Sequence, residues 1–337
     1  MSALSLSEDA RTAYAAARHR VALFPLERDI ISVRGPDRVS FVQGMVTQDV
    51  AQLSPGNAAY AALLTAKGAM VSDARVHCRT DALLLEVERG RGEAVKQFLE
   101  HYLISEDASL EDETTRFRLV RLCGPLAQNV LETAFAMKLP ALLLDAGVAC
   151  PTGETILGQA LWTENTWDVL VPEQLAETSE AKLYEAVYSS GGVEGGEEAA
   201  EVLRIEAGVP RYGKDMDEKT IPLEAGLTRA IHYKKGCYIG QEVIARATFR
   251  GQVNRQLAGF LLGELSPAPG TLLRNPAQPD RKLGVLTSVS HSPRMHQNIA
   301  LGYVHRDFIG PGTRLTLESG GEVQVAQLPF APTRAAG

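Results

Sequence analysis

One short segment, from Lys234 to Arg246, combines a thiol with glycines and basic side chains. Cys237 lies between Gly236 and Gly240, and glycine allows backbone conformations that other residues rarely adopt. The residues from Gln241 to Ala247 carry apolar side chains at helical spacing, which places the thiol just before a predicted helix. The positive end of a helix and nearby lysines both favour the thiolate over the thiol. The segment therefore predicts a reactive cysteine; a small residue packed in a turn is the alternative.

A second segment, Leu203 to Gly213, offers a carboxylate in an unusual position. Glu206 lies two residues before Gly208, where we expect a helix to end. A carboxylate near a helix C-terminus is electrostatically unfavourable, so Glu206 needs a partner. A carboxylate can accept two parallel N–H donors, and a pterin ring presents such a pair. Glu206 is therefore a candidate ligand contact, and the alternative is an ion pair with Arg204, Arg211 or another arginine.

The elements expected around these segments form two α+β modules and a β domain. Short strands alternate with amphipathic helices over about 20–115 and again over 116–190. A glycine-rich break at Ser189 to Gly196 predicts a linker. The residues 197–247 contain too few strands for a domain of their own, so we expect them to complete the first module. Short β-type runs separated by turns over 250–332 predict a small β-barrel or sandwich.

Composition narrows the class of protein. The chain has 337 residues, 45% of them apolar, and a formal net charge of -7, which argues against a dominant nucleic-acid surface. No apolar run reaches the roughly 18 residues that span a bilayer, and the N-terminus lacks the pattern of a secretory signal. We expect a soluble, cytoplasmic, monomeric protein that contacts neither nucleic acid nor membrane directly.

The four cysteines predict no metal site. Cys78, Cys123, Cys150 and Cys237 lie far apart, and no CxxC pair occurs. Four reduced thiols in a reducing compartment are the simplest interpretation. Cys78 and Cys123 lie in apolar, strand-like runs and are expected in the core.

The stretch KKGCYIGQEVIARATFRG, which begins at Lys234, closely resembles the signature of YgfZ-type folate-binding proteins. These are relatives of the glycine-cleavage T-protein, an aminomethyltransferase. Further stretches resemble the same superfamily, and together they extend the resemblance over about 25–305. These stretches are Val33 to Gly44, Arg204 to Asp215, Ile221 to Leu227, Gly284 to Ser288 and Ala300 to Val304.

The resemblance implies an α+β fold, a three-lobed T-protein-like ring with two α+β domains and a C-terminal β-barrel. The ring would hold tetrahydrofolate or a one-carbon derivative at its centre, in a discontinuous domain of 20–115 plus 197–247. Asp73 lies in a run that resembles an acidic position of the superfamily. Some members place tryptophans near the folate, and the matching positions here are Arg28 and Ala200. The residues expected to contact folate are Glu206, Asp73, Tyr212, Tyr238 and Arg246.

The resemblance implies two possible functions. The T-protein transfers a one-carbon unit from a lipoyl-bound aminomethyl group to tetrahydrofolate, and it typically has an acid or amide at the position of Cys237. YgfZ-type proteins carry the cysteine and support the assembly or repair of iron–sulfur enzymes, including radical enzymes that modify tRNA. The motif that places this chain with the second group comprises Lys235, Gly236, Cys237, Tyr238, Gly240, Gln241 and Glu242.

We therefore predict a folate-binding accessory protein for iron–sulfur client enzymes, with Cys237 and Lys235 as its catalytic groups. Such a protein need not be an enzyme in the usual sense. A lone thiolate suits a transient role, because iron–sulfur clusters are usually held by several cysteines. The alternative is a folate-dependent aminomethyltransferase or demethylase, and a third possibility is a structural adaptor that keeps only the fold.

Overall fold

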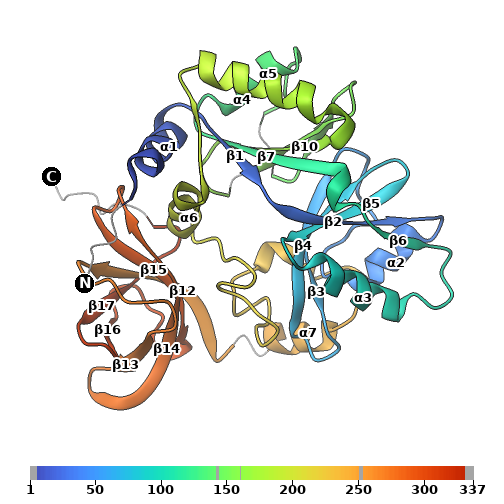
Figure 1. The fold of residues 1–337 in the computed structure, drawn as a ribbon. Helices are drawn as coiled ribbons and strands as arrows, with labels where there is room; N and C mark the ends of the chain where they lie inside the picture. The colour runs from blue at the N-terminus through green and yellow to red at the C-terminus, as the bar shows by residue number, and fades with distance from the viewer. Residues whose placement is uncertain (1–5, 142–143, 160, 250–252, 331–337) are drawn as a thin grey trace.

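Three lobes surround the centre of the molecule in the computed structural model, which describes residues 6–141, 144–159, 161–249 and 253–330 (Figure 1). Two lobes are built on open β-sheets and the third is a closed barrel. The predicted α+β fold with two α+β modules and a C-terminal β-barrel is confirmed.

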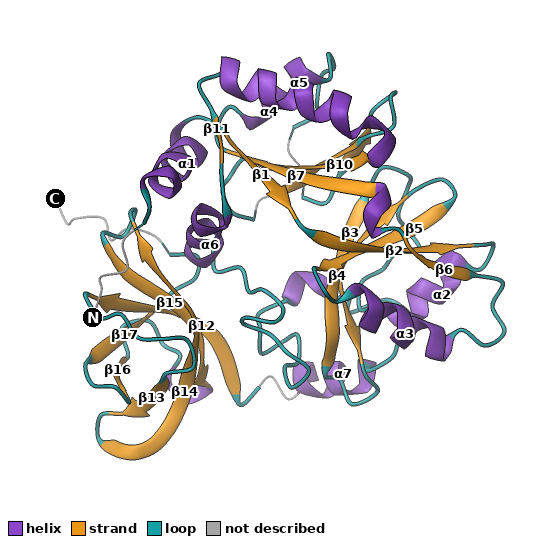
Figure 2. Cartoon of the chain, in the orientation of Figure 1, coloured by secondary structure: helices purple, strands orange, loops and turns teal. Residues whose placement is uncertain are grey.

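The first lobe is a five-stranded antiparallel sheet in the order β3-β4-β5-β2-β6. Its strands are β2 (Arg28–Arg34), β3 (Ala58–Leu64), β4 (Met70–Cys78), β5 (Ala82–Glu88) and β6 (Ser109–Asp112). The helices α2 (Arg38–Met45), α3 (Gly92–Tyr102) and α7 (Gln241–Phe249) belong to the same lobe. Figure 2 shows α2 and α3 on one side of this sheet.

Alternation along these strands separates apolar from charged side chains, since neighbouring residues of a strand point to opposite faces. On β4, Ala74 and Val76 join the apolar core beneath α2 and α3, whereas Asp73 and Arg75 point the other way. On β5, Leu85 and Val87 join the core and Glu86 and Glu88 face the centre. One face of the sheet is thus a core, and the other carries the charged side chains together with apolar residues such as Leu64 and Leu84.

The second lobe is a six-stranded sheet in the order β11-β1-β7-β10-β9-β8. Its strands are β1 (Ala22–Leu26), β7 (Phe117–Cys123), β8 (Gly147–Ala149), β9 (Thr155–Gln159), β10 (Thr166–Pro172) and β11 (Val193–Glu194). The helices α4 (Ala127–Ala134) and α5 (Ala176–Ser189) cover its outer face (Figure 2). Strand β1 lies within the range 20–115 yet pairs with β7, so it belongs to the second sheet.

The segment 189–196, predicted as a linker, contains strand β11, which pairs in parallel with β1. Gly195 donates its backbone N–H to the carbonyl of Leu23 at 2.8 Å and packs against the ring of Phe24. The glycines therefore permit close packing rather than free movement. From here the chain enters α6 (Glu197–Glu206), which packs beside the N-terminal helix α1 (Glu8–His19).

The third lobe is a closed barrel in the strand order β12-β15-β14-β13-β16-β17. Its strands are β12 (Arg255–Gly263), β13 (Leu272–Asn275), β14 (Gln278–Ser292), β15 (Gln297–His305), β16 (Arg314–Leu317) and β17 (Glu322–Ala326). Single 3-10 turns complete the elements at Thr114–Arg116, Glu173–Leu175, Thr228–Ala230 and Arg306–Phe308. The barrel contacts α6 through β14 and β15, so α6 lies between the barrel and the two sheets (Figure 1).

Candidate functional site

A cavity of about 870 Å³ lies where the charged faces of the two sheets and α6 meet. Its walls combine aromatic and apolar side chains with several arginines and acids. The lining includes both Arg28 and Ala200. These are the two positions that the resemblance to YgfZ-type proteins matches to tryptophans. A concave site with apolar walls and a few convergent polar groups is typical of small-molecule binding.

Asp73 contributes an unused acceptor to this cavity. The side chain is buried, with 8% of the residue exposed, and the Tyr60 hydroxyl donates to its Oδ2 at 2.8 Å. Its Oδ1 has no hydrogen-bond partner among the described residues. Burial raises the pKa of the Asp73 carboxyl, and the positive charge of Arg28 offsets this only in part. A buried, unsatisfied acceptor in a cavity is a position where a ligand donor is expected.

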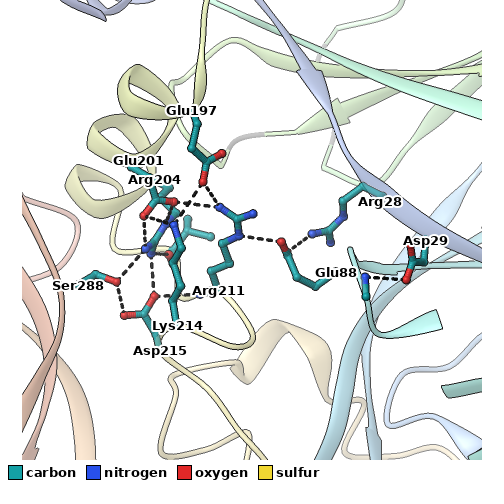
Figure 3. A network of polar contacts seen from close by, with 12 residues as sticks. Arg28, Asp29, Glu88, Glu197, Glu201, Arg204, Arg211, Lys214, Asp215 and Ser288 are labelled. Atoms are coloured by element: carbon teal, nitrogen blue, oxygen red, sulfur yellow. Dashed lines mark hydrogen bonds and ion pairs between the residues drawn. The ribbon is translucent and has the colours of Figure 1, made fainter. Parts of the chain in front are cut away.

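A continuous chain of charges forms one wall of the cavity and connects the first lobe to the barrel through α6 (Figure 3). It begins on the five-stranded sheet, where Arg28 binds Glu88, and Glu88 accepts from Arg211 Nε at 2.7 Å. Arg211 then contacts Glu197 and Glu201 of α6.

The same wall continues through α6 to the barrel. Arg204 donates to Glu201 Oε1 at 2.6 Å, to Asp215 Oδ2 at 2.7 Å and to the Ser288 hydroxyl at 2.7 Å. Ser288 in turn donates to Asp215 at 2.7 Å. Each carboxylate in this wall already has a cationic partner. The wall therefore shapes the cavity but offers a ligand few free hydrogen-bond acceptors.

Glu206 faces away from the cavity. Both carboxylate oxygens accept from the Tyr14 hydroxyl at 2.9 Å, and Arg18 and Ser292 also bind them. The residue is 1% exposed and is not part of the cavity lining. The ion-pair alternative therefore describes Glu206, although the partner is Arg18 on α1 rather than Arg204 or Arg211. Its acceptor capacity is used within the chain.

Lys235 acts as an anchor for the cysteine segment. Its ammonium group donates to the carbonyls of Gln43 at 2.6 Å, Val46 at 2.7 Å and Gln48 at 2.8 Å, at the end of α2 and just beyond it. Burial lowers the pKa of Lys235 to about 8, opposed by the charge of Asp49. All three N–H groups are therefore used to hold the loop on the first lobe.

Cys237 is exposed on this anchored loop. Helix α7 begins at Gln241, so the predicted helix after the thiol is confirmed. Gly240 has φ +82°, and an added Cβ would lie 2.6 Å from the Thr65 carbonyl oxygen, so glycine is required there. The described cavity lining includes no residue from 234 to 246, which places the thiol outside the Asp73 site.

The other three predicted folate contacts also lie outside the lining. Tyr212 is buried in a cluster with Met70, and the guanidinium of Arg91 lies 4.6 Å from its ring centroid. Tyr238 packs against the same cluster. Arg246 is largely exposed and donates to Glu242 at 2.5 Å. Of the predicted contacts, Asp73 alone is among the cavity residues that the structure describes.

Tyr60, which the sequence analysis did not single out, is the residue that completes the Asp73 site. It is the one side chain with a polar group in the strand sequence AAYAALL. A single hydroxyl in an otherwise apolar strand could have marked Tyr60 as a candidate site residue. Its partnership with Asp73 depends on the pairing of β3 with β4, which spacing alone does not define.

The remaining cysteines are less accessible. Burial raises the pKa of the Cys123 and Cys150 thiols to about 12, and it also raises the pKa of Cys78. Within the described residues, no group of three or more His, Cys, Asp or Glu side chains could hold a metal ion. No described helix is long and apolar enough to cross a membrane.

Comparison with known proteins first defines the class. The chain superimposes on the crystal structure of the glycine cleavage system aminomethyltransferase T from Bartonella henselae with a TM-score of 0.84, over 96% of this chain and 90% of that one. The two sequences are 24% identical, so this likeness concerns the fold. The molecule is thus a T-protein-type ring of two sheets and a barrel.

Sequence models then assign the family. Residues 5–235 match the GCVT N-terminal domain, and residues 255–331 match the glycine cleavage T-protein C-terminal barrel domain. The chain belongs to the glycine cleavage T-protein family. An aminomethyltransferase of Rubrobacter xylanophilus is 31% identical over 94% of this chain and 84% of its own length. An aminomethyltransferase of Pelodictyon phaeoclathratiforme is 30% identical over 89% of this chain and 84% of its own length.

Proposed function

We propose that the central cavity binds tetrahydrofolate or a one-carbon derivative, and that the chain is a folate-dependent one-carbon transferase of the aminomethyltransferase type. The observation that carries the proposal is the unused, buried Oδ1 of Asp73 in a cavity of about 870 Å³. Two relatives covering most of the chain are named aminomethyltransferases. A pterin ring carries N–H donors that would satisfy this oxygen, so the residues present fit the ligand.

In this proposal Asp73 binds and orients the ligand. Tyr60 holds Oδ2, which fixes the rotation of the carboxyl group and directs Oδ1 toward the ligand. When bound, tetrahydrofolate supplies ring nitrogens that accept a one-carbon unit. Burial also raises the pKa of Asp73, and a more basic carboxylate is a stronger acceptor for the N–H donors of the ligand.

Calorimetry with tetrahydrofolate tests the binding step. We expect Asp73→Asn to weaken binding by about 1.5–3 kcal/mol, the range for a hydrogen bond that involves a charge. The control is Glu242→Gln on α7, whose side chain is 81% exposed and outside the lining. Absence of binding to the native protein at millimolar ligand, or equal binding by Asp73→Asn, would contradict the proposal. Release of ammonia from a lipoyl-bound aminomethyl donor tests the reaction.

A second candidate function is accessory support of iron–sulfur enzymes, as the YgfZ-type motif implies. One observation favours it: Cys237 is the exposed thiol, on a loop anchored by Lys235. The names of the relatives favour the transferase. Complementation of a strain that lacks the protein separates the two. Loss of tRNA thiolation with Cys237→Ser supports the accessory role, whereas loss of glycine cleavage with Asp73→Asn supports the transferase.

A further inference from the structure

Tyr60, the partner of Asp73, lies beside two arginines. The guanidinium carbon of Arg229 is 5.6 Å from the centroid of the Tyr60 ring, and that of Arg75 is 6.0 Å away. Cations at this distance from an aromatic ring interact with it electrostatically. A positive charge near a phenol also stabilises negative charge on its oxygen, which makes the hydroxyl a stronger hydrogen-bond donor.

Both arginines share one anionic partner, Asp145. Its Oδ2 accepts from Arg229 Nη2 at 3.2 Å, and its Oδ1 forms an ion pair with Arg75 Nε at 3.4 Å. Arg75 also reaches Asp168 of β10 at 3.3 Å. The two cations beside Tyr60 are therefore connected through a carboxylate that belongs to the other lobe.

Asp145 reaches this position through an unusual backbone arrangement. It precedes β8 in the second lobe and has φ +60°, a conformation that costs most residues free energy but that aspartate tolerates better. Its backbone N–H donates to the Gly158 carbonyl at 3.0 Å, and its carbonyl accepts from Ala58 at the start of β3 at 3.1 Å. Strained conformations persist where their surroundings hold them, and they cluster at functional sites.

We propose that Asp145 is a positioning residue of the Asp73 site: by holding Arg75 and Arg229 beside Tyr60, it keeps the Tyr60 hydroxyl a strong donor to Asp73. The inference rests on the proposed function, in which Asp73 contacts the ligand. It adds to the site a residue of the second lobe that the cavity lining does not include.

The direction in which the pKa of Asp73 changes follows from hydrogen bonding to its ionised carboxylate. A stronger donor stabilises the ionised carboxylate of Asp73 and lowers its pKa. In Asp145→Asn the guanidinium groups lose their shared partner, and Arg229, with 35% of its side chain exposed, can turn toward solvent. The Tyr60 hydroxyl then becomes a weaker donor and the pKa of Asp73 rises. The charged groups that face this pair are Arg28, Arg75, Glu86, Glu88, Asp145, Asp168 and Arg229.

Carboxyl-carbon NMR of aspartate-labelled protein without ligand measures this pKa, with the Asp73 signal assigned from Asp73→Asn. We expect Asp145→Asn to raise the pKa of Asp73 by about half a unit or more, as expected when a hydrogen bond to the ionised form weakens. Asp145→Glu should restore most of the native value. Asn57→Ala is the matched control, because Asn57 Oδ1 accepts from Gly147 at 3.0 Å and holds the same loop without a charge.

An unchanged or lower pKa in Asp145→Asn, or an equal rise in Asn57→Ala, overturns the proposal. If Asp145→Asn does not fold, Arg229→Gln removes one of the two cations and should raise the pKa of Asp73 in the same way; no rise there also overturns it. Because the titration uses unliganded protein, it remains decisive if tetrahydrofolate does not bind, and the calorimetry with Asp73→Asn tests that separately.

Discussion

Asp73 and Glu206 are both buried acids near the centre of the ring, and they differ in what their oxygens contact. Glu206 has donors on both oxygens from α1 and the barrel. Asp73 has one donor and one unused oxygen in the cavity. Burial alone therefore does not identify a binding residue; the unfilled acceptor does, because an unsatisfied buried group is costly unless a ligand or water completes it.

Cys237 is expected to react before the other thiols. It is exposed, whereas burial raises the pKa of Cys123 and Cys150 to about 12, which leaves almost no thiolate at neutral pH. A limiting amount of iodoacetamide, followed by peptide mass spectrometry, should label Cys237 first. Cys237→Ser should change the free energy of unfolding by less than about 0.5 kcal/mol, as for other surface substitutions.

Labelling after denaturation is the control, since all four thiols should then react alike. Preferential native labelling of Cys78 or Cys150 would contradict the exposure of the loop around Cys237. A large loss of stability in Cys237→Ser would instead indicate that the thiol packs in the turn, which is the alternative raised by the sequence.

At the scale of elements, α6 holds α1 and the barrel together through Glu206. We expect Glu206→Gln to lower the free energy of unfolding by about 2–4 kcal/mol, because it leaves Arg18 without its anionic partner in a mostly buried position. Urea denaturation measures this. Glu198→Gln on the same helix is the matched control, since Glu198 is exposed and its side chain binds only Ser7 among the described hydrogen bonds. This substitution should lower the free energy of unfolding by less than about 1 kcal/mol.

Tetrahydrofolate binding by folded Glu206→Gln should stay within a few fold of the native value. A stable Glu206→Gln variant that loses the ligand would instead support a pterin contact, one of the two roles that the sequence leaves open for Glu206.

The local elements could be predicted because they depend on local patterns. Alternation in Met70–Cys78 and Ala82–Glu88 indicates strands, and the apolar spacing after Gly240 indicates α7. The partner of Glu206 could not be predicted, because Arg18 lies 188 residues away. For the same reason, spacing did not reveal that Tyr60 meets Asp73 or that β1 joins the second sheet; both depend on strand pairing.

At the scale of the whole molecule, the ring closes where the chain passes from β11 to α6. An added Cβ at Gly195 would lie 2.2 Å from the ring of Phe24, whereas at Gly196 no described atom lies within 4 Å. Gly195→Ala should therefore destabilise the protein by about 1–3 kcal/mol through overpacking. Gly196→Ala is the matched control and should cost less than about 1 kcal/mol, the scale of a helix N-cap change.

Thermal unfolding of both variants checks this prediction. Equal stability of the two alanine variants would mean that Phe24 yields easily and that the closure is not tightly packed. A loss of stability in Gly195→Ala but not in Gly196→Ala would show that tight packing between β1 and the segment after β11 stabilises the ring.

The pairing of β1 with β11 also has a consequence for the order of events during synthesis. The buried members of the apolar core beneath α2 and α3 lie between residues 31 and 99, so this core can form while the ribosome is still translating the second sheet. Strand β1 acquires its partner β11 only after residue 193 has emerged, and contacts so distant in sequence form slowly. The nascent chain therefore has a folded first core well before it has a cavity. During that interval the opposite face of the first sheet, which carries Ile30 and Leu84 as well as charged side chains, faces water until Leu119 and Leu170 of the second sheet cover it. Apolar side chains exposed in this way during folding favour aggregation.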